Sequence, residues 1–197
     1  DEDPGVYKLT PLSAQSCLTA AGDRLTIKGG VYTGASARIT AIFSGTVGNP
    51  TIVEGDPSDA AGCAITSTCS TILRPTTSNP VYTTDDSYFI LRKLDLDAVN
   101  FPQAYALRLG NTGGTCTGIL IEDVETHNSG TVNAASGIMN EPMCHATTYR
   151  RVHSHHNGVA GGTGGHGLYQ QGDNVIIEHS SFHDNRSFGL QCYNSTT

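Results

Sequence analysis

The segment Phe89-Ile-Leu-Arg-Lys-Leu-Asp-Leu-Asp97 has three further copies along the chain, which begin at Ile119, Thr147 and Val175. Successive copies are offset by 30, 28 and 28 residues. A period of roughly 20 to 50 residues is typical of solenoids, in which each repeat packs only against its neighbours. Because each copy has the composition of a short β-strand and lies between Gly and Asn residues, the repeats predict the coils of a parallel β-helix.

The copies share columns of like character. The columns predicted to face inward supply the residues that we expect to be buried: Leu91, Leu94, Leu96, Ile121, Val124, Tyr149, Val152, Ile177 and Phe182. Two charged columns lie between them, namely Arg92, Glu122, Arg150 and Glu178, and Lys93, Asp123, Arg151 and His179. The sign of charge alternates almost strictly down both columns, which predicts strands stacked side by side with like charges kept apart.

The second half of each repeat adds another short apolar run after a loop of variable length, at residues 105–109, 137–139, 167–169 and 189–191. Solenoids tolerate such loops between fixed strands. We therefore expect an all-β parallel β-helix of about six coils. Residues 13–21 have helix-forming composition, with Ser13 as N-cap and Gly22 as stop, and predict a short helix that covers the first coil.

The chain has 197 residues, which favours one domain. We divide it into an N-terminal segment (1–22), first coils (23–56), an irregular Cys-containing excursion (57–80) and regular coils (81–197). The net charge is −7 and no basic stripe carries interleaved aromatic residues, so we expect no nucleic-acid partner. We also expect no membrane span, because no apolar run is long enough.

Six cysteines and two glycosylation sequons, at Asn185 and Asn194, favour a secreted glycoprotein over a cytosolic protein. Cys116 and Cys144 lie at nearly the same point of successive coils, so their Cα atoms should lie within disulfide range. Cys63 and Cys69 form the natural local pair, although six buried thiols are the alternative.

Cys17 and Cys192 remain, and several coils separate them. Both are free, or Cys17 pairs within the excursion, or Cys192 of one subunit meets Cys17 of the next. The last arrangement would build a head-to-tail filament, because a contact that does not close produces a fibre.

Several longer phrases carry a family resemblance. They are Gly22-Asp-Arg-Leu-Thr-Ile-Lys-Gly-Gly-Val-Tyr32, the run Ser44-Gly-Thr-Val-Gly-Asn-Pro-Thr-Ile-Val-Glu-Gly55, and His166-Gly-Leu-Tyr169 with Asn174-Val-Ile-Ile-Glu-His-Ser-Ser-Phe-His-Asp-Asn185. From Leu12 onward the chain resembles the right-handed parallel β-helix proteins of the pectate-lyase-like superfamily. It looks most like the branch with alginate-lyase-like and chondroitinase-B-like enzymes. The Arg-His-Gly phrase of the chondroitinase-B-like lyases is absent.

This resemblance implies cleavage of acidic polysaccharide by β-elimination, in which a base removes a proton next to a uronate carboxylate and Ca²⁺ often neutralises that carboxylate. The candidate catalytic cations are Lys93, Arg150 and Arg151, and the candidate substrate or Ca²⁺ ligands are Glu122, Asp123 and Glu125. The alternating signs favour a structural ladder of ion pairs over catalysis at these positions.

Histidines form one more column. His127, His155 and His183 align under Asp97, with His153, His156 and His179 beside them. Coils stack about 4.8 Å apart, so these imidazoles either share a metal ion or form a plain solvent-facing stack. Asn157 and Asn185 align in the next column and are expected to cap the turn.

Three functions remain open at this stage. The first is a secreted protein that binds or cleaves extracellular acidic polysaccharide, with a lyase as its enzymatic form. The second is a structural protein that self-associates head to tail through its coil ends. The third is a metal-binding surface built on the histidine column.

Overall fold

The computed structural model describes residues 10–56, 71–101, 105–111, 113–130, 135–159 and 164–193. One helix, α1 (Pro11–Ala14), is followed by a 3₁₀ turn at Gln15–Cys17. The early strands are β1 (Arg24–Thr26), β2 (Gly30–Thr33), β3 (Thr51–Glu54), β4 (Thr71–Arg74) and β5 (Val81–Tyr82). The later strands are β6 (Phe89–Asp97), β7 (Leu107–Leu109), β8 (Cys116–His127), β9 (Ile138–Asn140), β10 (Cys144–His155), β11 (Leu168–Gln170), β12 (Ile176–Glu178), β13 (Ser181–His183) and β14 (Leu190–Cys192).

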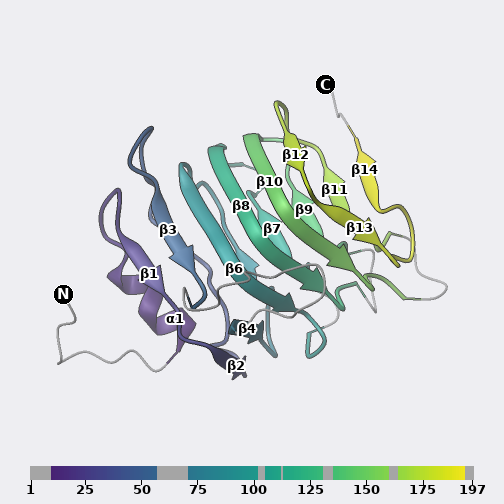
Figure 1. The fold of residues 1–197 in the computed structure, drawn as a ribbon, viewed down its shortest axis with the longest axis horizontal. Helices are drawn as coiled ribbons and strands as arrows, with labels where there is room; N and C mark the ends of the chain where they lie inside the picture. The colour runs from purple at the N-terminus through teal and green to yellow at the C-terminus, as the bar shows by residue number, and fades with distance from the viewer. Residues whose placement is uncertain are drawn as a thin grey trace.

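These strands form two sheets in which every pairing is parallel. The nine-stranded sheet follows the order β1-β3-β6-β8-β10-β12, with β2, β4 and β13 joined beside this path. The five-stranded sheet has the order β5-β7-β9-β11-β14. Successive coils follow one another from α1 and β1 at one end of the molecule to β14 at the other (Figure 1). The fold is a parallel β-solenoid of about five turns, close to the six that the repeats predict.

The register confirms the alignment of the repeats. Leu94 pairs with Val124 and Val124 with Val152, at the offsets that the sequence predicts. Seven of the nine residues expected in the core are fully buried. Ile177 and Phe182 are not: Ile177 is 37% exposed and Phe182 is half-buried. Their strands, β12 and β13, pair only with β10 among the described strands, so no neighbouring coil covers them there.

Left-handed backbone conformations bend the long strands at one column of residues. Lys93, Asp123, Arg151 and His179 have φ angles of 56°, 53°, 52° and 51°. The bend turns the chain from one face of the solenoid to the next, so β6, β8 and β10 each contribute to two faces of the nine-stranded sheet. A non-glycine residue in this region is uncommon, and its recurrence at one register position marks a corner of the solenoid.

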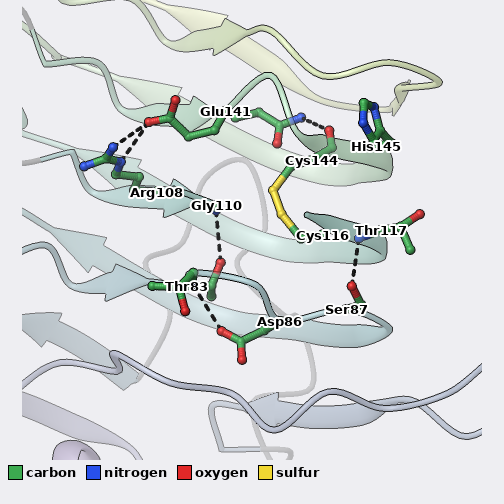
Figure 2. The surroundings of a disulfide bond; sticks show 12 residues. Thr83, Asp86, Ser87, Arg108, Gly110, Cys116, Thr117, Glu141, Cys144 and His145 are labelled. Carbon is green, nitrogen blue, oxygen red and sulfur yellow. Dashed lines mark hydrogen bonds and ion pairs between the residues drawn. A yellow bond between two sulfur atoms is a disulfide. The ribbon is translucent and has the colours of Figure 1, made fainter. Parts of the chain in front are cut away.

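Cys116 and Cys144 are joined by a disulfide, as the coil spacing predicts (Figure 2). They are direct partners on β8 and β10, and their Cα atoms lie 4.4 Å apart. Gly110 lies against this bridge, where a Cβ atom would be 2.6 Å from the sulfur of Cys144. Cys17 and Cys192 are free and exposed. The expected pair of Cys63 and Cys69 lies outside the described residues.

The N-terminal helix begins earlier than predicted. Thr10, not Ser13, is the N-cap, because its Oγ1 accepts a hydrogen bond from the Ser13 amide at 3.3 Å. Pro11 occupies the first turn of the helix, where a backbone N–H would have no partner within the helix, so the N–H that proline lacks is not missed. The segment 71–74 also departs from expectation, since it forms the regular strand β4 instead of belonging to an irregular excursion. No helix in the described part of the chain has the length and apolar character to span a membrane.

Candidate functional site

The first charged column forms a continuous ladder across the coils. Glu54, Arg92, Glu122, Arg150 and Glu178 are direct register partners in that order. Arg92 Nη2 lies 2.6 Å from Glu54, and Arg150 Nε lies 2.8 Å from Glu178. The predicted side-by-side arrangement is confirmed, and it extends one coil further toward the N-terminus than the repeats showed.

Arg151 in the corner column binds two carboxylates at once. Its Nε lies 2.6 Å from Asp123 Oδ1 and its Nη2 lies 2.8 Å from Glu122 Oε1. The hydrogen bond to Asp123 is the main cause of a raised Arg151 pKa. A guanidinium held in this way is a poor proton acceptor. The catalytic role of Arg150 and Arg151 therefore stays a prediction, which this geometry does not favour. The third candidate, Lys93, lies in the same corner column as Arg151, and its catalytic role also stays a prediction.

The candidate calcium ligands are likewise engaged with basic side chains. Glu122 and Asp123 accept hydrogen bonds from Arg151, and Glu125 Oε1 lies 2.7 Å from His155 Nε2. Within the part of the chain that the structure describes, no group of three or more His, Cys, Asp or Glu side chains is placed to hold a metal ion. A calcium site at these carboxylates remains a prediction without a formed ligand set.

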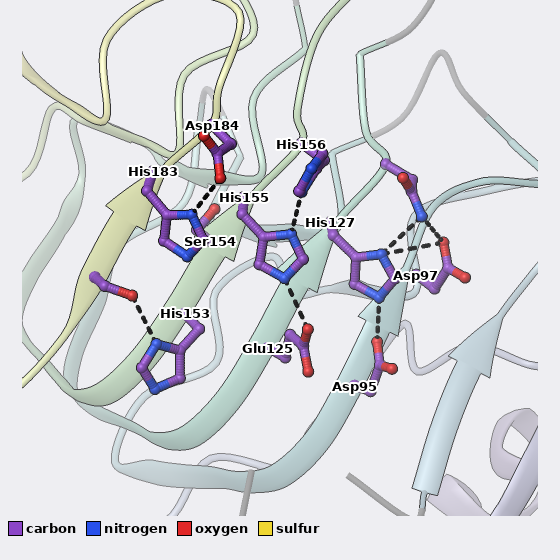
Figure 3. A network of polar contacts seen from close by, with 12 residues as sticks. Asp95, Asp97, Glu125, His127, His153, Ser154, His155, His156, His183 and Asp184 are labelled. Carbon is purple, nitrogen blue, oxygen red and sulfur yellow. Dashed lines mark hydrogen bonds and ion pairs between the residues drawn. The ribbon is translucent and has the colours of Figure 1, made fainter. Parts of the chain in front are cut away.

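The histidine column forms as predicted. Asp97, His127, His155 and His183 are register partners on four successive coils. The rings of His127 and His155 stack with centroids 5.3 Å apart, as do those of His155 and His183 (Figure 3).

Each of the first two imidazoles binds a carboxylate that lies one coil back. His127 Nε2 lies 2.7 Å from Asp95 Oδ1, and His155 Nε2 lies 2.7 Å from Glu125 Oε1 (Figure 3). The other nitrogen of His155 lies 2.7 Å from His156 Nδ1. Both nitrogens of His155 are therefore used in hydrogen bonds, so metal binding by this column stays a prediction that the geometry does not favour.

Burial and neighbouring charges shift the pKa values of ionisable side chains on this face. Burial lowers the pKa of His127, but the hydrogen bond to Asp95 and the nearby carboxylates raise it more, so the net shift is upward. Burial raises the pKa of Asp95. Burial also lowers the pKa of His153. Neighbouring histidines on this face are thus tuned in opposite directions.

A pocket that the sequence did not indicate lies on the outer face of the five-stranded sheet. Its volume is about 300 Å³, and its lining residues are Tyr105, Ser136, Gly164, His166, Tyr169 and Gln191. Tyr169 comes from β11, and its strand neighbours Leu168 and Gln170 point into the core. The pocket thus gathers residues from two strands, β11 and β14, and from the variable loops that precede β7, β9 and β11.

Ring stacking organises one wall of this pocket. His166 stacks on Tyr169 at 5.4 Å and on Phe188 at 5.7 Å between centroids. Its Nδ1 accepts a hydrogen bond from the Phe188 amide at 3.3 Å. In the neutral ring the proton must then be on Nε2. Burial lowers the pKa of His166, which favours this neutral form.

Arg108 closes the neighbouring part of the same face. Its guanidinium lies 5.2 Å from the ring centre of Tyr82 and 5.8 Å from that of Tyr105. Its Nη2 is 2.7 Å from Glu141 Oε1, a pair that Figure 2 shows. Burial raises the pKa of Tyr105, so its hydroxyl stays protonated. In the sequence, the indication of this face was the run His166-Gly-Leu-Tyr169. A glycine before a strand is equally typical of an ordinary turn of the solenoid.

One of the two predicted glycosylation sites, Asn185, forms side-chain hydrogen bonds at a turn. The Asn185 side chain belongs to a ladder at the turn: its Oδ1 accepts from Asn157 Nδ2 at 2.8 Å, and its Nδ2 donates to the Ser154 carbonyl at 2.9 Å. The expected turn-capping role of Asn157 and Asn185 is confirmed. Asn194 lies outside the described residues, and glycosylation at either position stays a prediction.

Comparisons with known proteins show which solved structure has a similar fold. No protein-family model and no curated protein sequence matches the chain. Among solved structures, the crystal structure of pectate lyase Pel9A is similar, with a TM-score of 0.65 at 14% sequence identity. The match covers 93% of this chain and 44% of the pectate lyase chain, so this chain spans less than half of that length. The protein has a pectate-lyase-like parallel β-helix fold.

Proposed function

We propose that the protein binds polysaccharide on the outer face of the five-stranded sheet, in the pocket lined by Tyr105, His166 and Tyr169. The observation that carries this proposal is the pocket itself, which combines three ring systems with the hydroxyl of Ser136 and the amide of Gln191. The fold likeness to a pectate lyase supports a polysaccharide ligand. A disulfide and this fold together favour an extracellular protein.

The chemistry of the lining suits a sugar chain. Sugar rings carry apolar C–H groups and many hydroxyls, so they need apolar contact together with donors and acceptors. Tyrosine and histidine provide both, since each has an apolar ring and a polar tip. The stacking of His166 between Tyr169 and Phe188 holds these rings in place before any ligand arrives, which reduces the entropy cost of binding.

Binding is better supported than cleavage. A neutral His166 with its proton on Nε2 donates a hydrogen bond and does not remove a proton. The cations of the charged columns, Arg150 and Arg151, are neutralised by carboxylates. Cleavage by β-elimination is the narrower proposal. It is tested by incubating the protein with pectin, alginate or a glycosaminoglycan, with and without Ca²⁺, and measuring the ultraviolet absorbance of an unsaturated product.

The binding proposal is tested by isothermal titration of neutral and acidic oligosaccharides into the wild type and Tyr169→Ala. Loss of one wall of the pocket should reduce affinity at least about tenfold, which corresponds to about 1.4 kcal/mol. Phe43→Ala is the matched control, because Phe43 is an aromatic residue that is 44% exposed and does not line the pocket. Equal affinity of the Tyr169→Ala variant and the wild type would refute the pocket as the binding site.

Self-association is a second candidate function. It is favoured by the exposure of Cys17, in the turn that follows α1, and of Cys192, at the end of β14. Figure 1 shows α1 and β14 at opposite ends of the solenoid. The apolar side chains of Ile177 and Leu190, on β12 and β14, are also 37% and 41% exposed. A head-to-tail contact would cover these side chains and bring the two thiols together.

A further inference from the structure

A column of mainly aliphatic side chains runs along the outward side of the nine-stranded sheet, beside the ion-pair ladder. Side chains alternate between the two sides of a strand, so the residue two positions before each ladder residue also points outward. These residues are register partners on five successive coils: Ile52, Ile90, Leu120, Thr148 and Ile176. We call this column the aliphatic stripe, and the strands that carry it lie side by side in Figure 1.

The aliphatic stripe is partly exposed to solvent along its whole length. Ile176 is 52% exposed, and the other four members are half-buried. The inward neighbours on the same strands, such as Leu91 and Ile121, are fully buried. The outer position of a strand at a solvated face ordinarily carries a polar side chain, which only Thr148 of the five provides. A contiguous line of exposed apolar side chains marks an interaction surface.

The two charged columns next to the stripe have balanced charges. They contain four acidic and four basic side chains: Glu54, Glu122, Asp123 and Glu178, and Arg92, Lys93, Arg150 and Arg151. A strongly charged partner, such as a nucleic acid, would therefore meet no complementary field on this face. The face instead presents a sign of charge that alternates from one coil to the next.

The alternating signs make this face complementary to a second copy of itself. A two-fold axis that lies along the strand direction, between β6 and β8, reverses the order of the coils and keeps each column opposite its own counterpart. It places Ile90 opposite Leu120 of the second copy, and Arg92 opposite Glu122 of the second copy. The same rule holds one coil further out on each side. Apolar side chains thus meet apolar side chains, and each of these charges meets its opposite.

We propose that the aliphatic stripe is the contact surface of a homodimer, in which two solenoids pack face to face with antiparallel axes. Packing of the stripes removes partly exposed apolar surface of both copies from water, which drives association. Five coils about 4.8 Å apart make the stripe roughly 20 Å long, which is at the small end for a specific interface. We therefore expect reversible association with a dissociation constant in the micromolar range.

This dimer goes beyond polysaccharide binding and does not depend on it. The stripe lies on the nine-stranded sheet, whereas the aromatic pocket lies on the five-stranded sheet and shares no residue with the stripe. The dimer also differs from head-to-tail assembly, because neither the coil ends nor the thiols of Cys17 and Cys192 take part in it. It would carry two aromatic pockets, so a polysaccharide chain that reaches both would be held more tightly than by a monomer.

Sedimentation velocity in the presence of a reducing agent, from about 1 to about 200 µM protein, tests this interface. The wild type should shift from monomer to dimer as the concentration rises. Leu120→Lys should raise the dissociation constant at least about tenfold, because it places a charge opposite Ile90 of the second copy, whereas Leu120→Ile should retain the dimer. Val99→Lys is the matched control, because Val99 is 48% exposed, follows β6 and is not part of the stripe.

A wild type that stays monomeric over this range overturns the inference. So does a dimer that is unchanged in Leu120→Lys, or one that Val99→Lys weakens equally. Loss of the dimer in the double variant Cys17→Ser with Cys192→Ser would assign the association to the coil ends and also overturn it. Melting curves check that each variant is folded, and Ile90→Lys, for which we expect the same loss, decides the question if Leu120→Lys does not fold.

Discussion

Val124 is a fully buried residue between Leu94 and Val152 on the neighbouring coils. Because it is packed from both sides along the column, Val124→Asp would place a charge where no partner exists. We expect a loss of roughly 4 kcal/mol or more in the free energy of unfolding, or no folded protein, measured by urea denaturation. Val99→Asp is the control: Val99 is 48% exposed, so its change should stay within about 0.5 kcal/mol. Similar stability of both variants would contradict the register.

His127 should make stability depend on pH. Its pKa in the folded protein is raised above the unfolded value of 6.5 by Asp95 and the nearby carboxylates, against the opposing effect of burial. The protonated form is therefore stabilised on folding, and this contribution is fully present below pH 6.5 while Asp95 is ionised. It is lost as the pH rises through the raised pKa of His127.

The difference in unfolding free energy between the wild type and His127→Gln should accordingly be larger at about pH 6 than at about pH 9. Chemical denaturation at both pH values measures it. Asp95→Asn provides the matched control, because it removes the 2.7 Å contact while leaving the imidazole, and should lower the His127 pKa in an NMR titration. An equal difference at both pH values would contradict the role of the pair.

At the scale of the strands, the bridge between β8 and β10 links coils that are already paired. It closes a loop with a sequence separation of 28 residues. Restricting the unfolded chain over such a loop contributes about 3.5 kcal/mol in the chain-entropy model. The double variant Cys116→Ala with Cys144→Ala should lose about that much stability in urea denaturation. Cys17→Ala, at an exposed free thiol, should lose almost none, and equal effects would contradict the bridge.

The strands and their register could be predicted because apolar columns repeat at a fixed offset, and a one-residue slip would turn Leu94 and Val124 outward. The corners were not predictable in the same way. Left-handed conformations usually indicate glycine, yet Lys93, Asp123 and Arg151 occupy them here. The aromatic pocket was missed because it joins residues from loops of variable length, whose relative positions no periodic pattern specifies.

The whole molecule is a stack in which each column of the sequence becomes a line of side chains along the axis. The charged columns became a ladder of ion pairs, as the alternating signs favoured. The histidine column became a hydrogen-bonded stack for the same geometric reason. Residues that repeat regularly thus serve the stack, whereas most of the proposed binding residues lie in loops of variable length, namely Tyr105, Ser136, Gly164 and His166.

The two ends of the stack carry the thiols Cys17 and Cys192, both free and exposed. Cys17 follows α1 and Cys192 ends β14, and these elements lie at opposite ends of the solenoid (Figure 1), so the two thiols cannot bridge within one molecule. If the protein functions by binding polysaccharide and does not assemble through these thiols, non-reducing gel electrophoresis should show a monomer band. A reducible ladder of multimers would contradict this expectation and support head-to-tail assembly. Cys17→Ser and Cys192→Ser should each then abolish the ladder.

A crystal structure of the protein soaked with oligogalacturonate locates the binding face directly. We predict electron density for sugar rings in the pocket of Tyr105, His166 and Tyr169, on the outer face of the five-stranded sheet. Density along the ion-pair column at Arg150 and Arg151, with the aromatic pocket empty, would contradict this assignment.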